Sequence, residues 1–438
     1  MTLFNKYNLI YLVIKNMEKL TDKEKNIRLY PLYKTFAWDL FFYYAIAFLF
    51  LTQVKKLTPA DVLLTEAAYP IFKILLLVPL TAFIEKRGKR KSLILANISI
   101  TLSVLILIFA QNIRYVFISQ FFSALGYMIK GICETNMLYD SLPRNSKRGG
   151  LFARIDGRAT GYYYYINAIT SFAAGFLYII NPYIPMILCA SMCIIATVIC
   201  FRFREIDDDE NVVDNKKYIE NTKDSYRSIL KSPRLRNLIF FGAMVYGLLA
   251  ILVTLRNSLL KDVGLPEQYF GVIFAILEMI SGITTRNQHK FHNRLKNRTL
   301  TVLSIPVTIS CIILGIVANS NMPFVFIITT LILLYLVQYI VKGPFYILIK
   351  RYLNNFTTHK IRNKISSLYN LVENLLRCMI ALIASILLRY INTANVFIII
   401  GTVFTIILSA LLINMKDKVG LKPEEYTEKD IEFLKLLV

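Results

Sequence analysis

Twelve long apolar stretches, six in each half of the chain, constrain its fold more than any other feature. A helix needs about 20 apolar residues to cross the hydrocarbon core of a bilayer. Hydrophobic residues make up 56% of the 438-residue chain, which is more apolar surface than a water-soluble core of this size can hide. The sequence therefore predicts an all-α, polytopic membrane protein with spans near residues 33–54, 62–84, 92–110, 115–139, 160–180, 183–202, 236–259, 268–285, 299–318, 323–349, 365–388 and 394–414.

One long polar connector, which contains the acidic run Asp207-Asp208-Asp209-Glu210, separates the two halves. The halves also resemble each other in layout, because Leu57-Thr58-Pro59 before one span is matched by Gly264-Leu265-Pro266 before another. Repeated six-helix halves are typical of secondary transporters. We expect two pseudo-symmetric bundles, with the chain divided into a cytoplasmic N-terminal segment 1–30, a bundle 31–203, a cytoplasmic connector 204–235, a bundle 236–414 and a cytoplasmic tail 415–438.

The formal net charge of +23 lies mainly in alternate loops between the spans. Cytoplasmic loops of membrane proteins carry an excess of Lys and Arg, so this alternation predicts orientation rather than a nucleic-acid-binding face. Both termini are then cytoplasmic, and we expect the protein in a bacterial cytoplasmic membrane. The basic loops lie within residues 86–91, 144–158, 286–298 and 350–364.

Metal, cofactor and nucleotide chemistry find no support in the sequence. All six cysteines lie in apolar stretches, where a thiol behaves as a small hydrophobic group. His289, His292 and His359 lie in basic loops without further ligands nearby. We therefore expect neither a metal nor a cofactor. Because no phosphate-binding loop of the Walker type is present, we also expect no ATP-driven pumping.

The loop between the second and third spans reads Thr81-Ala82-Phe83-Ile84-Glu85-Lys86-Arg87-Gly88-Lys89-Arg90. It resembles the signature of the major facilitator superfamily, G-x-x-x-D-[RK]-x-G-[RK]-[RK], with Thr81 at the first Gly and Glu85 at the Asp. The resemblance covers residues 30–414. It implies a gating loop in which the acid faces the start of span eleven and holds the halves together on the cytoplasmic side. These residues are Glu85, Lys86, Gly88, Lys89 and Arg90; the simpler alternative is a set of positive-inside anchors.

Two departures argue against a proton-coupled drug exporter of this superfamily. Such exporters carry an Arg in span four, where this chain offers Gln120, Gly126 and Lys130. They also carry a Gly-Pro motif in span five, where this chain has Ser171-Phe172-Ala173-Ala174-Gly175. The small residues of span five favour close helix packing instead.

Ionisable residues inside spans are costly, so each is a candidate for substrate binding or ion coupling. The resemblance implies that spans one, four, seven and ten line a cavity and that two, five, eight and eleven flank it. Charges occur in these two groups of spans and are absent from the interiors of spans three, six, nine and twelve. The candidates are Asp39, Lys73, Lys130, Glu134, Glu278, Lys342, Glu373 and Arg377.

Some of these candidates have predicted partners. Lys130 and Glu134, like Glu373 and Arg377, are four residues apart and share a helix face, so self-neutralising structural pairs are the alternative to a functional role. Lys73 lies in mid-span without an opposite charge within one turn, and the resemblance, which places span two against span eleven, nominates Glu373 as its partner. Asp39 is either a coupling acid or the partner of a basic loop.

Three further features carry simpler interpretations. Glu66 lies near the outer end of span two. Arg256 lies at the outer rim of span seven, where snorkelling explains it. The run Tyr162-Tyr163-Tyr164-Tyr165 fits the interfacial aromatic belt, with a wall of the substrate site as the alternative.

We therefore predict a monomeric secondary active transporter that moves a small solute by alternating access within the lipid bilayer. We expect ion coupling, with protons as the candidate ion, and favour efflux over uptake. The alternative is a membrane-embedded enzyme acting on a lipid-linked substrate, although no catalytic residues are identified. The short basic loops disfavour such an enzyme, which needs acids or a nucleophile grouped at one face.

Overall fold

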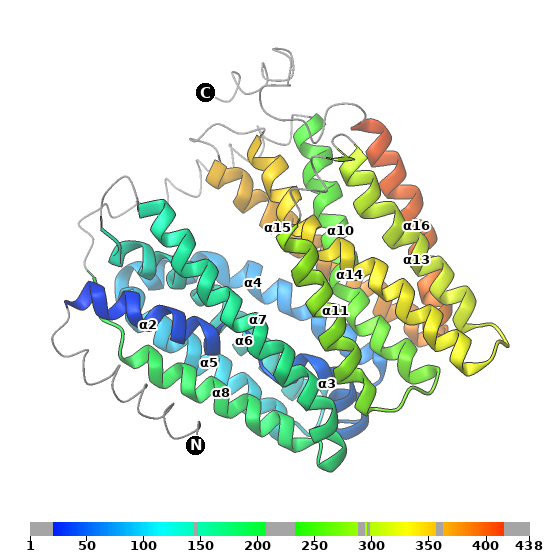
Figure 1. The fold of residues 1–438 in the computed structure, drawn as a ribbon, viewed down its shortest axis with the longest axis horizontal. Coiled ribbons are helices and arrows are strands. Elements are labelled where there is room, and N and C mark those ends of the chain that lie inside the picture. Colours follow the sequence, from blue (N-terminus) through cyan, green and yellow to red (C-terminus); the bar gives the residue numbers. More distant parts are fainter. Residues whose placement is uncertain are drawn as a thin grey trace.

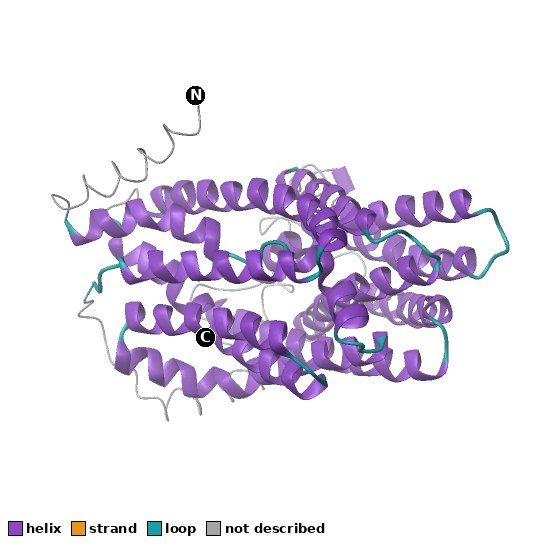
Figure 2. Ribbon diagram, turned by 90° about the horizontal axis from the view of Figure 1, so that it is seen from below, coloured by secondary structure: helices purple, strands orange, loops and turns teal. Residues whose placement is uncertain are grey.

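The computed structural model describes residues 21–143, 148–206, 233–287, 294–295, 298–355 and 362–415. Within these ranges every regular element is helical (Figures 1 and 2). Ten helices are long and apolar enough to cross a membrane, and the first and second spans complete the predicted set of twelve. The three histidines, the acidic run Asp207–Glu210, and most of the predicted connector and tail lie outside the described residues.

The N-terminal half contains the predicted spans one to six. Its helices are α2 (Asp22–Ala37), α3 (Tyr43–Leu49), α4 (Pro59–Arg87), α5 (Lys89–Phe109), α6 (Ile113–Ser141), α7 (Arg148–Ile180) and α8 (Tyr183–Phe201). The C-terminal half contains spans seven to twelve as α10 (Pro233–Asp262), α11 (Gln268–Arg286), α13 (Thr299–Ala318), α14 (Phe324–Asn355), α15 (Arg362–Tyr390) and α16 (Thr393–Asn414). Eleven of the predicted spans correspond to one continuous helix each.

Local sequence signals explain where several helices begin and end. Thr58 caps α4 in a capping box with Asp61, and Pro59 occupies the first turn, where its missing N–H costs nothing. Gly88 separates α4 from α5 with φ = 83°, a conformation that a side chain would strain. The chain therefore turns sharply at this glycine.

The first span differs from the prediction because it is broken. α2 begins at Asp22 and ends at Ala37, and the chain resumes as α3 only at Tyr43, followed by a π-helical turn over Phe50–Val54. Phe42 at the break has a left-handed backbone conformation with φ = 64°, which is rare for a bulky residue. Such outliers concentrate at functional sites, and they cost about 1–3 kcal/mol each.

The two halves are joined along two lines of helix packing. α4 packs against α15, as predicted for spans two and eleven, and α7 packs against α11. Within the halves, α5 packs against α6 and α13 against α16. The two bundles converge at the lower right of Figure 1 and diverge toward its upper left.

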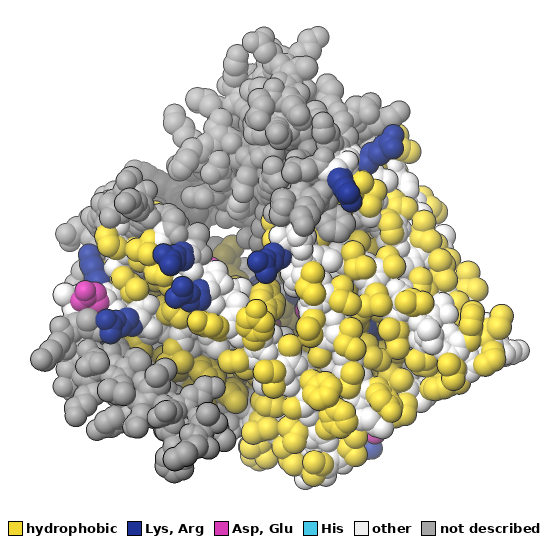
Figure 3. All heavy atoms as spheres, viewed as in Figure 1, with side chains coloured by type: hydrophobic (Ala, Val, Ile, Leu, Met, Phe, Trp, Pro, Cys, Tyr) yellow, Lys and Arg dark blue, Asp and Glu magenta, His cyan; other side chains and the backbone are white. Residues whose placement is uncertain are grey.

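The outer surface of the bundles is largely apolar. Exposed side chains include Phe109, Ile180 and Val325, and hydrophobic atoms cover most of the C-terminal half in Figure 3. Most Lys and Arg side chains visible in that view lie toward the diverging end of the bundles. An apolar belt of this kind suits contact with lipid, where backbone groups are satisfied inside each helix.

Candidate functional site

A cavity of about 610 Å³ lies between the two halves. Its wall comes from the break between α2 and α3 and from α3, α4, α5, α6 and α7 of the N-terminal half, and from α10, α11, α14 and α15 of the C-terminal half. Because both halves contribute side chains, any relative movement of the halves changes this site. The charged residues of the wall are Asp39, Glu66, Glu278, Lys342 and Arg377.

Aromatic side chains dominate the cavity wall. The wall contains Trp38 and a group of tyrosines from both halves, which include Tyr163 and Tyr164 of α7. Both residues border the cavity, so for them the alternative of a substrate-site wall fits the structure better than an interfacial belt; Tyr163 is buried, whereas Tyr162, Tyr164 and Tyr165 are exposed. Helical geometry explains the split, since four consecutive residues cannot all point to one side of a helix. The lining tyrosines are Tyr43, Tyr44, Tyr69, Tyr127, Tyr163, Tyr164, Tyr246 and Tyr346.

Asp39 lies at the break between α2 and α3 and borders the cavity. One carboxylate oxygen accepts hydrogen bonds from the Leu40 N–H (2.9 Å) and from the Tyr127 hydroxyl (3.0 Å). The hydroxyls of Tyr44 and Tyr163 also interact with this carboxylate. Asp39 is therefore held in place by hydroxyl and amide groups, and none of its described contacts comes from the basic loop proposed as its alternative partner.

Glu66 belongs to the cavity, and its position near the outer end of span two concealed this role. Its carboxylate accepts a hydrogen bond from the hydroxyl of Thr254 on α10, so the contact joins the two halves. Arg377 on α15 interacts electrostatically with the same carboxylate. The Arg377 guanidinium also lies 5.6 Å from the centre of the Tyr69 ring. A carboxylate, a hydroxyl and a guanidinium from three helices therefore meet at this point.

Glu278 and Lys342 were both predicted as candidates, but not as partners. They form an ion pair of 2.7 Å between α11 and α14 in the C-terminal half. The ammonium also lies 4.6 Å from the centre of the Tyr339 ring. Because the two residues are far apart in sequence, only the packing of α11 against α14 reveals the pair.

Lys130 and Glu134 form the predicted pair along α6, with a separation of 4.0 Å and both side chains buried. Neither residue borders the cavity. The Lys130 ammonium and one Glu134 oxygen, Oε1, make no hydrogen bond. Nearby, Lys34 of α2 pairs with Asp156 of α7, which also accepts a hydrogen bond from the Tyr30 hydroxyl (2.6 Å). These charges lie inside the N-terminal half.

Lys73 on α4 faces α15, as the predicted contact between spans two and eleven requires. Its ammonium lies 4.8 Å from the centre of the Tyr69 ring. Glu373 attracts this ammonium electrostatically, whereas Arg377 repels it. Glu373 also interacts with the hydroxyl of Tyr246. The three charges therefore form one group where the halves begin to separate.

Arg256 lies near the end of α10 but is buried, so the interpretation that it snorkels is wrong. Only 2% of its surface is exposed. Its guanidinium donates to the Tyr339 hydroxyl (2.6 Å) and to Asn257 Oδ1 (3.1 and 3.2 Å). It also lies 5.7 Å from the centre of the Phe274 ring. Hydrogen bonds and aromatic rings thus stabilise this cation inside the C-terminal half.

One end of the cavity is closed by direct contacts between the halves. Gly175 of α7 and Gly271 of α11 meet so closely that a methyl group on either would lie 2.6 Å from a backbone oxygen of the other helix. Gln53 donates to Glu267 (2.7 Å) and accepts from the Tyr178 hydroxyl (2.9 Å). The further contacts between halves at this end are Lys261 to Thr52 at 3.3 Å and Ser385 to the Ala60 carbonyl at 2.7 Å.

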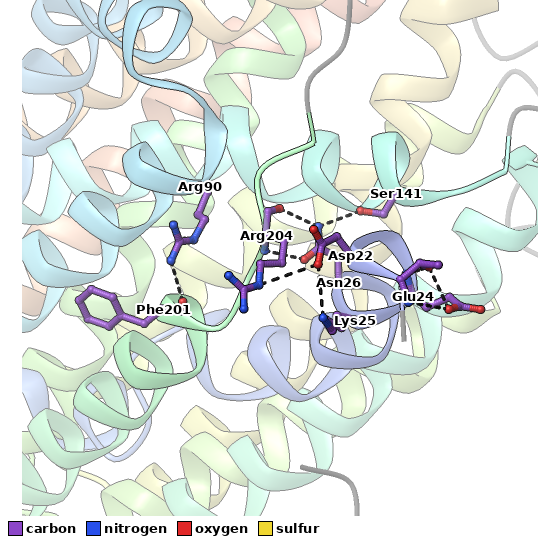
Figure 4. A network of polar contacts seen from close by, with 9 residues as sticks. Asp22, Glu24, Lys25, Asn26, Arg90, Ser141, Phe201 and Arg204 are labelled. Carbon is purple, nitrogen blue, oxygen red and sulfur yellow. Dashed lines mark hydrogen bonds and ion pairs between the residues drawn. The ribbon is translucent and has the colours of Figure 1, made fainter. Parts of the chain in front are cut away.

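The predicted gating loop lies at the opposite, diverging end. The backbone N–H groups of Lys89 and Arg90 both donate to the Glu205 carboxylate at 2.8 Å, and the Lys89 ammonium pairs with Asp140. Arg90 also donates to the Phe201 carbonyl at 2.9 Å (Figure 4). The side chain of Glu85 is not among those that the structure describes.

These described contacts of the gating loop all stay within the N-terminal half. The contact of Glu205 with this loop was not predicted. Its position just after span six, on the same side as the basic loop, could have indicated it. A neighbouring cluster joins α2 to the ends of α6 and α8. There Asn26 donates to Ser141 (3.2 Å) and to the Arg204 carbonyl (2.9 Å) (Figure 4).

Known proteins resemble this chain in sequence pattern and in fold. The sequence model of the family described as Major Facilitator Superfamily matches residues 35–329. No curated protein matches the chain. The solved structure of the nucleoside transporter NupG superposes with a TM-score of 0.71 at 12% identity, covering 91% of this chain and 100% of that one.

Two other solved structures show the same fold. A POT family transporter in complex with 5-aminolevulinic acid has a TM-score of 0.64 at 14% identity and covers 90% of this chain and 94% of its own. A bacterial homolog of the human lysosomal transporter Spinster, in an inward-facing and unoccupied conformation, has a TM-score of 0.63 at 13% identity and covers 95% of each chain.

Proposed function

The chain belongs to the Major Facilitator Superfamily, and we propose that it is an ion-coupled secondary transporter that exports a small solute. Membership of this family identifies a transporter rather than an enzyme, so the alternative of an enzyme acting on a lipid-linked substrate is not pursued. The observation that carries the proposal is the cavity of about 610 Å³, which both halves line with charged and aromatic side chains.

The proposed state is inward-facing. The ends that meet at Gly175 and Gly271 adjoin the short loops with few cations, which we assign to the outside. The diverging ends adjoin the basic loops, which we assign to the cytoplasm. In this state an exporter would receive its solute from the cytoplasm and an importer would release its solute there, so the direction of efflux is part of the proposal and is tested by the release of solutes from cells.

Ion coupling is proposed for the carboxylates in and beside the cavity. Asp39 has no basic partner within 4.0 Å among the described residues, and the Glu278 carboxylate is held by Lys342. Such groups change their interactions when they gain or lose a proton. The remaining candidates for substrate binding or coupling are Lys73, Lys130, Glu134, Glu373 and Arg377.

We further propose a monomer in the bacterial cytoplasmic membrane with both termini in the cytoplasm. We propose the segments 1–30, 31–203, 204–235, 236–414 and 415–438. Within the first of them α2 already begins, and it packs against α7 and α8. Reporter fusions at Asn181, Asn319 and Asn392 should score as outside. Fusions at Arg148, Asp214 and Lys360 should score as inside, and reversed scores at two of these sites would contradict the orientation.

The function is tested by the solutes that cells release. Cells expressing the full chain should accumulate at least one small metabolite in the medium, relative to cells expressing Gly175→Leu, in which the closed end is destabilised. The metabolite so found should cross proteoliposomes containing the purified protein faster when a proton gradient is imposed. Identical media would contradict the export function, and flux that ignores the gradient would contradict proton coupling.

A further inference from the structure

We infer that Asp39 and the aromatic rings around it bind a positively charged nitrogen of the transported solute. This inference rests on the proposed transport function and names the substrate class. The class is small organic ammonium compounds, cationic or zwitterionic, with an apolar or aromatic body. The inference rests on the charge balance of the cavity, the geometry of Asp39 and the nature of the surrounding surface.

The charge balance of the cavity leaves one carboxylate over. Among the residues that the structure describes, five charged ones line the wall, three acidic and two basic. Lys342 pairs with Glu278 at 2.7 Å, and Arg377 interacts with Glu66, whose carboxylate Thr254 also contacts. Asp39 is the remaining acid, and no Lys or Arg nitrogen lies within 4.0 Å of it in the part of the chain that the structure describes.

The nearest lysines have carboxylates of their own. Lys34 pairs with Asp156, and Lys130 pairs with Glu134 along α6. Lys130 therefore acts on Asp39 only at longer range. A carboxylate in a membrane-embedded cavity without a close counter-ion is costly, and a cation supplied by the solute removes that cost.

The break between α2 and α3 places this carboxylate in the cavity. In a continuous helix the Leu40 N–H would donate to a backbone carbonyl, but here it donates to Asp39 itself at 2.9 Å. The left-handed Phe42, with φ = 64°, redirects the chain immediately afterward. Discontinuous membrane helices are a recurrent way to build ion and substrate sites, because they free polar groups at mid-membrane depth.

Aromatic faces surround the carboxylate and suit an organic cation. Trp38 lies beside Tyr163, with ring centres 6.0 Å apart, and both border the cavity. Tyr44 and Tyr127 complete the group and interact with Asp39 through their hydroxyls. Rings of this kind attract ammonium groups through cation–π interactions. The Lys34 ammonium already lies 4.1 Å from the centre of the Trp38 ring and the Lys130 ammonium 5.3 Å from that of Tyr127, so a solute cation would use the ring faces that these lysines do not occupy. A bare metal ion would instead need a compact shell of oxygen ligands, which the ring faces do not provide.

Trp38 is the only tryptophan in the chain, so its fluorescence reports on this site directly. We would titrate the purified full-length protein with 2-phenylethylamine and with 2-phenylethanol, which has the same ring but a neutral end group. The wild type should bind the amine about tenfold more tightly than the alcohol, as expected for one desolvated cation–carboxylate contact with ring support. Tyramine and tryptamine, followed by calorimetry, extend the amine series.

Variants assign the preference to Asp39. Asp39→Asn should reduce the amine-to-alcohol ratio to about one, and Asp39→Glu should keep most of it, because the charge remains. Asp22→Asn, which removes an exposed carboxylate at the start of α2, is the matched control and should keep the full ratio. Alcohol binding that is unchanged in Asp39→Asn shows that the cavity is still folded.

Four results would overturn the inference. The first is an absence of saturable amine binding by the wild type, and the second is an amine-to-alcohol affinity ratio that is unchanged in Asp39→Asn. The third is a ratio that is lost in Glu66→Gln but kept in Asp39→Asn. The fourth is that NaCl, but not KCl, displaces the bound ligand while the wild type shows no preference for the amine. The last result would assign the site to a coupling ion. The titration measures binding without transport. A negative titration would therefore not contradict the export function, and a negative export assay would not contradict the binding result.

Discussion

The two ends of the cavity are built from different kinds of contact. At the closed end, α7 meets α11 at a pair of glycines, and hydrogen bonds such as Gln53 to Glu267 cross from one half to the other. At the diverging end, the described contacts of the gating loop, such as Glu205 with Lys89 and Arg90, remain inside one half. The closed end must therefore lose its contacts when the halves rock, whereas these contacts of the open end can persist.

This difference indicates which contacts set the equilibrium between the state that is closed at the Gly175–Gly271 end and the state that is open there. Contacts that exist in only one state shift the equilibrium by their own free energy, and contacts that exist in both states do not. Substitutions at the closed end should therefore change which side the cavity faces. Substitutions in the contacts of the gating loop that we describe should change local stability alone.

The glycine contact should give the largest effect. Gly175→Leu places a side chain against the backbone of α11, and overpacking of this kind costs about 1–3 kcal/mol, which corresponds to a shift of about ten- to hundredfold toward the state open at this end. The measurement is the labelling rate, by an impermeant maleimide added outside, of a cysteine introduced at Val253 in the cavity wall. Gly157→Leu on the same helix, where a methyl group meets no atom within 4 Å, is the control and should label slowly.

The contact between Thr254 and Glu66 should give the next effect. Thr254→Val removes a hydroxyl that donates to a carboxylate of the other half and leaves that carboxylate without this donor. A hydrogen bond to a charged group contributes about 1.5–3 kcal/mol, so labelling at Val253→Cys should rise about tenfold. Thr65→Val is the matched control, because its buried hydroxyl donates to the Val62 carbonyl within the same helix. Equal labelling of the two variants would show that this contact does not hold the closed end.

A double-mutant cycle on Gln53 and Glu267 should give a smaller effect. The two side chains meet at 2.7 Å across the closed end and are partly buried. Their coupling free energy should be about 1 kcal/mol, or about a fivefold change in labelling beyond the sum of the single variants. Additive single effects would mean that Gln53 acts mainly through the Tyr178 hydroxyl of its own half.

At the open end, Glu205→Gln should change stability without changing orientation. The Glu205 carboxylate caps the first turn of α5, and loss of such a cap costs about 1 kcal/mol. We expect Glu205→Gln to unfold at a lower temperature. The labelling rate of Val253→Cys should change by less than about twofold when Glu205→Gln is added. A large change in labelling would show that this end also sets the equilibrium, and would refute the comparison.

The ion pair between Asp61 and Arg389 should give the smallest effect among the contacts of the closed end. It joins the halves at the closed end, but its separation is 3.8 Å and more than half of the Arg389 side chain is exposed. Exposed pairs contribute about 0–1 kcal/mol, so Arg389→Ala should alter labelling by less than about threefold. A larger change would indicate that Arg389 holds more than this one carboxylate.

Much of the fold was predictable because a bilayer imposes a simple pattern. Every span must be a long apolar helix, and cations mark the loops on one side. Eleven of the twelve predicted spans match single helices, nine of them within a few residues at both ends, whereas α7 begins well before its predicted span and α14 ends after it. Thr58-Pro59 and Gly88 mark helix ends directly. The packing of α4 against α15 followed from the family resemblance rather than from the residues alone.

The candidate site was predictable only in its residue types. The cost of a charge inside a span singled out Asp39, Glu278, Lys342 and Arg377, all of which line the cavity. The same rule could not pair Glu278 with Lys342, because their contact depends on how α11 and α14 pack. Arg256 lies near a helix end, where snorkelling and burial have the same sequence pattern, and only the surrounding Tyr339 and Phe274 distinguish them.

The sequence by itself therefore determined the membrane-spanning helices, the two halves and the side that carries the cations, because hydropathy and loop charge act locally along the chain. Tertiary structure alone decided that the first span breaks at Asp39, that Glu66 and Thr254 join the halves, and that one end is closed through Gly175 and Gly271. Those features depend on which helices lie side by side. Contacts between distant segments set that arrangement, and no local pattern in the chain records it.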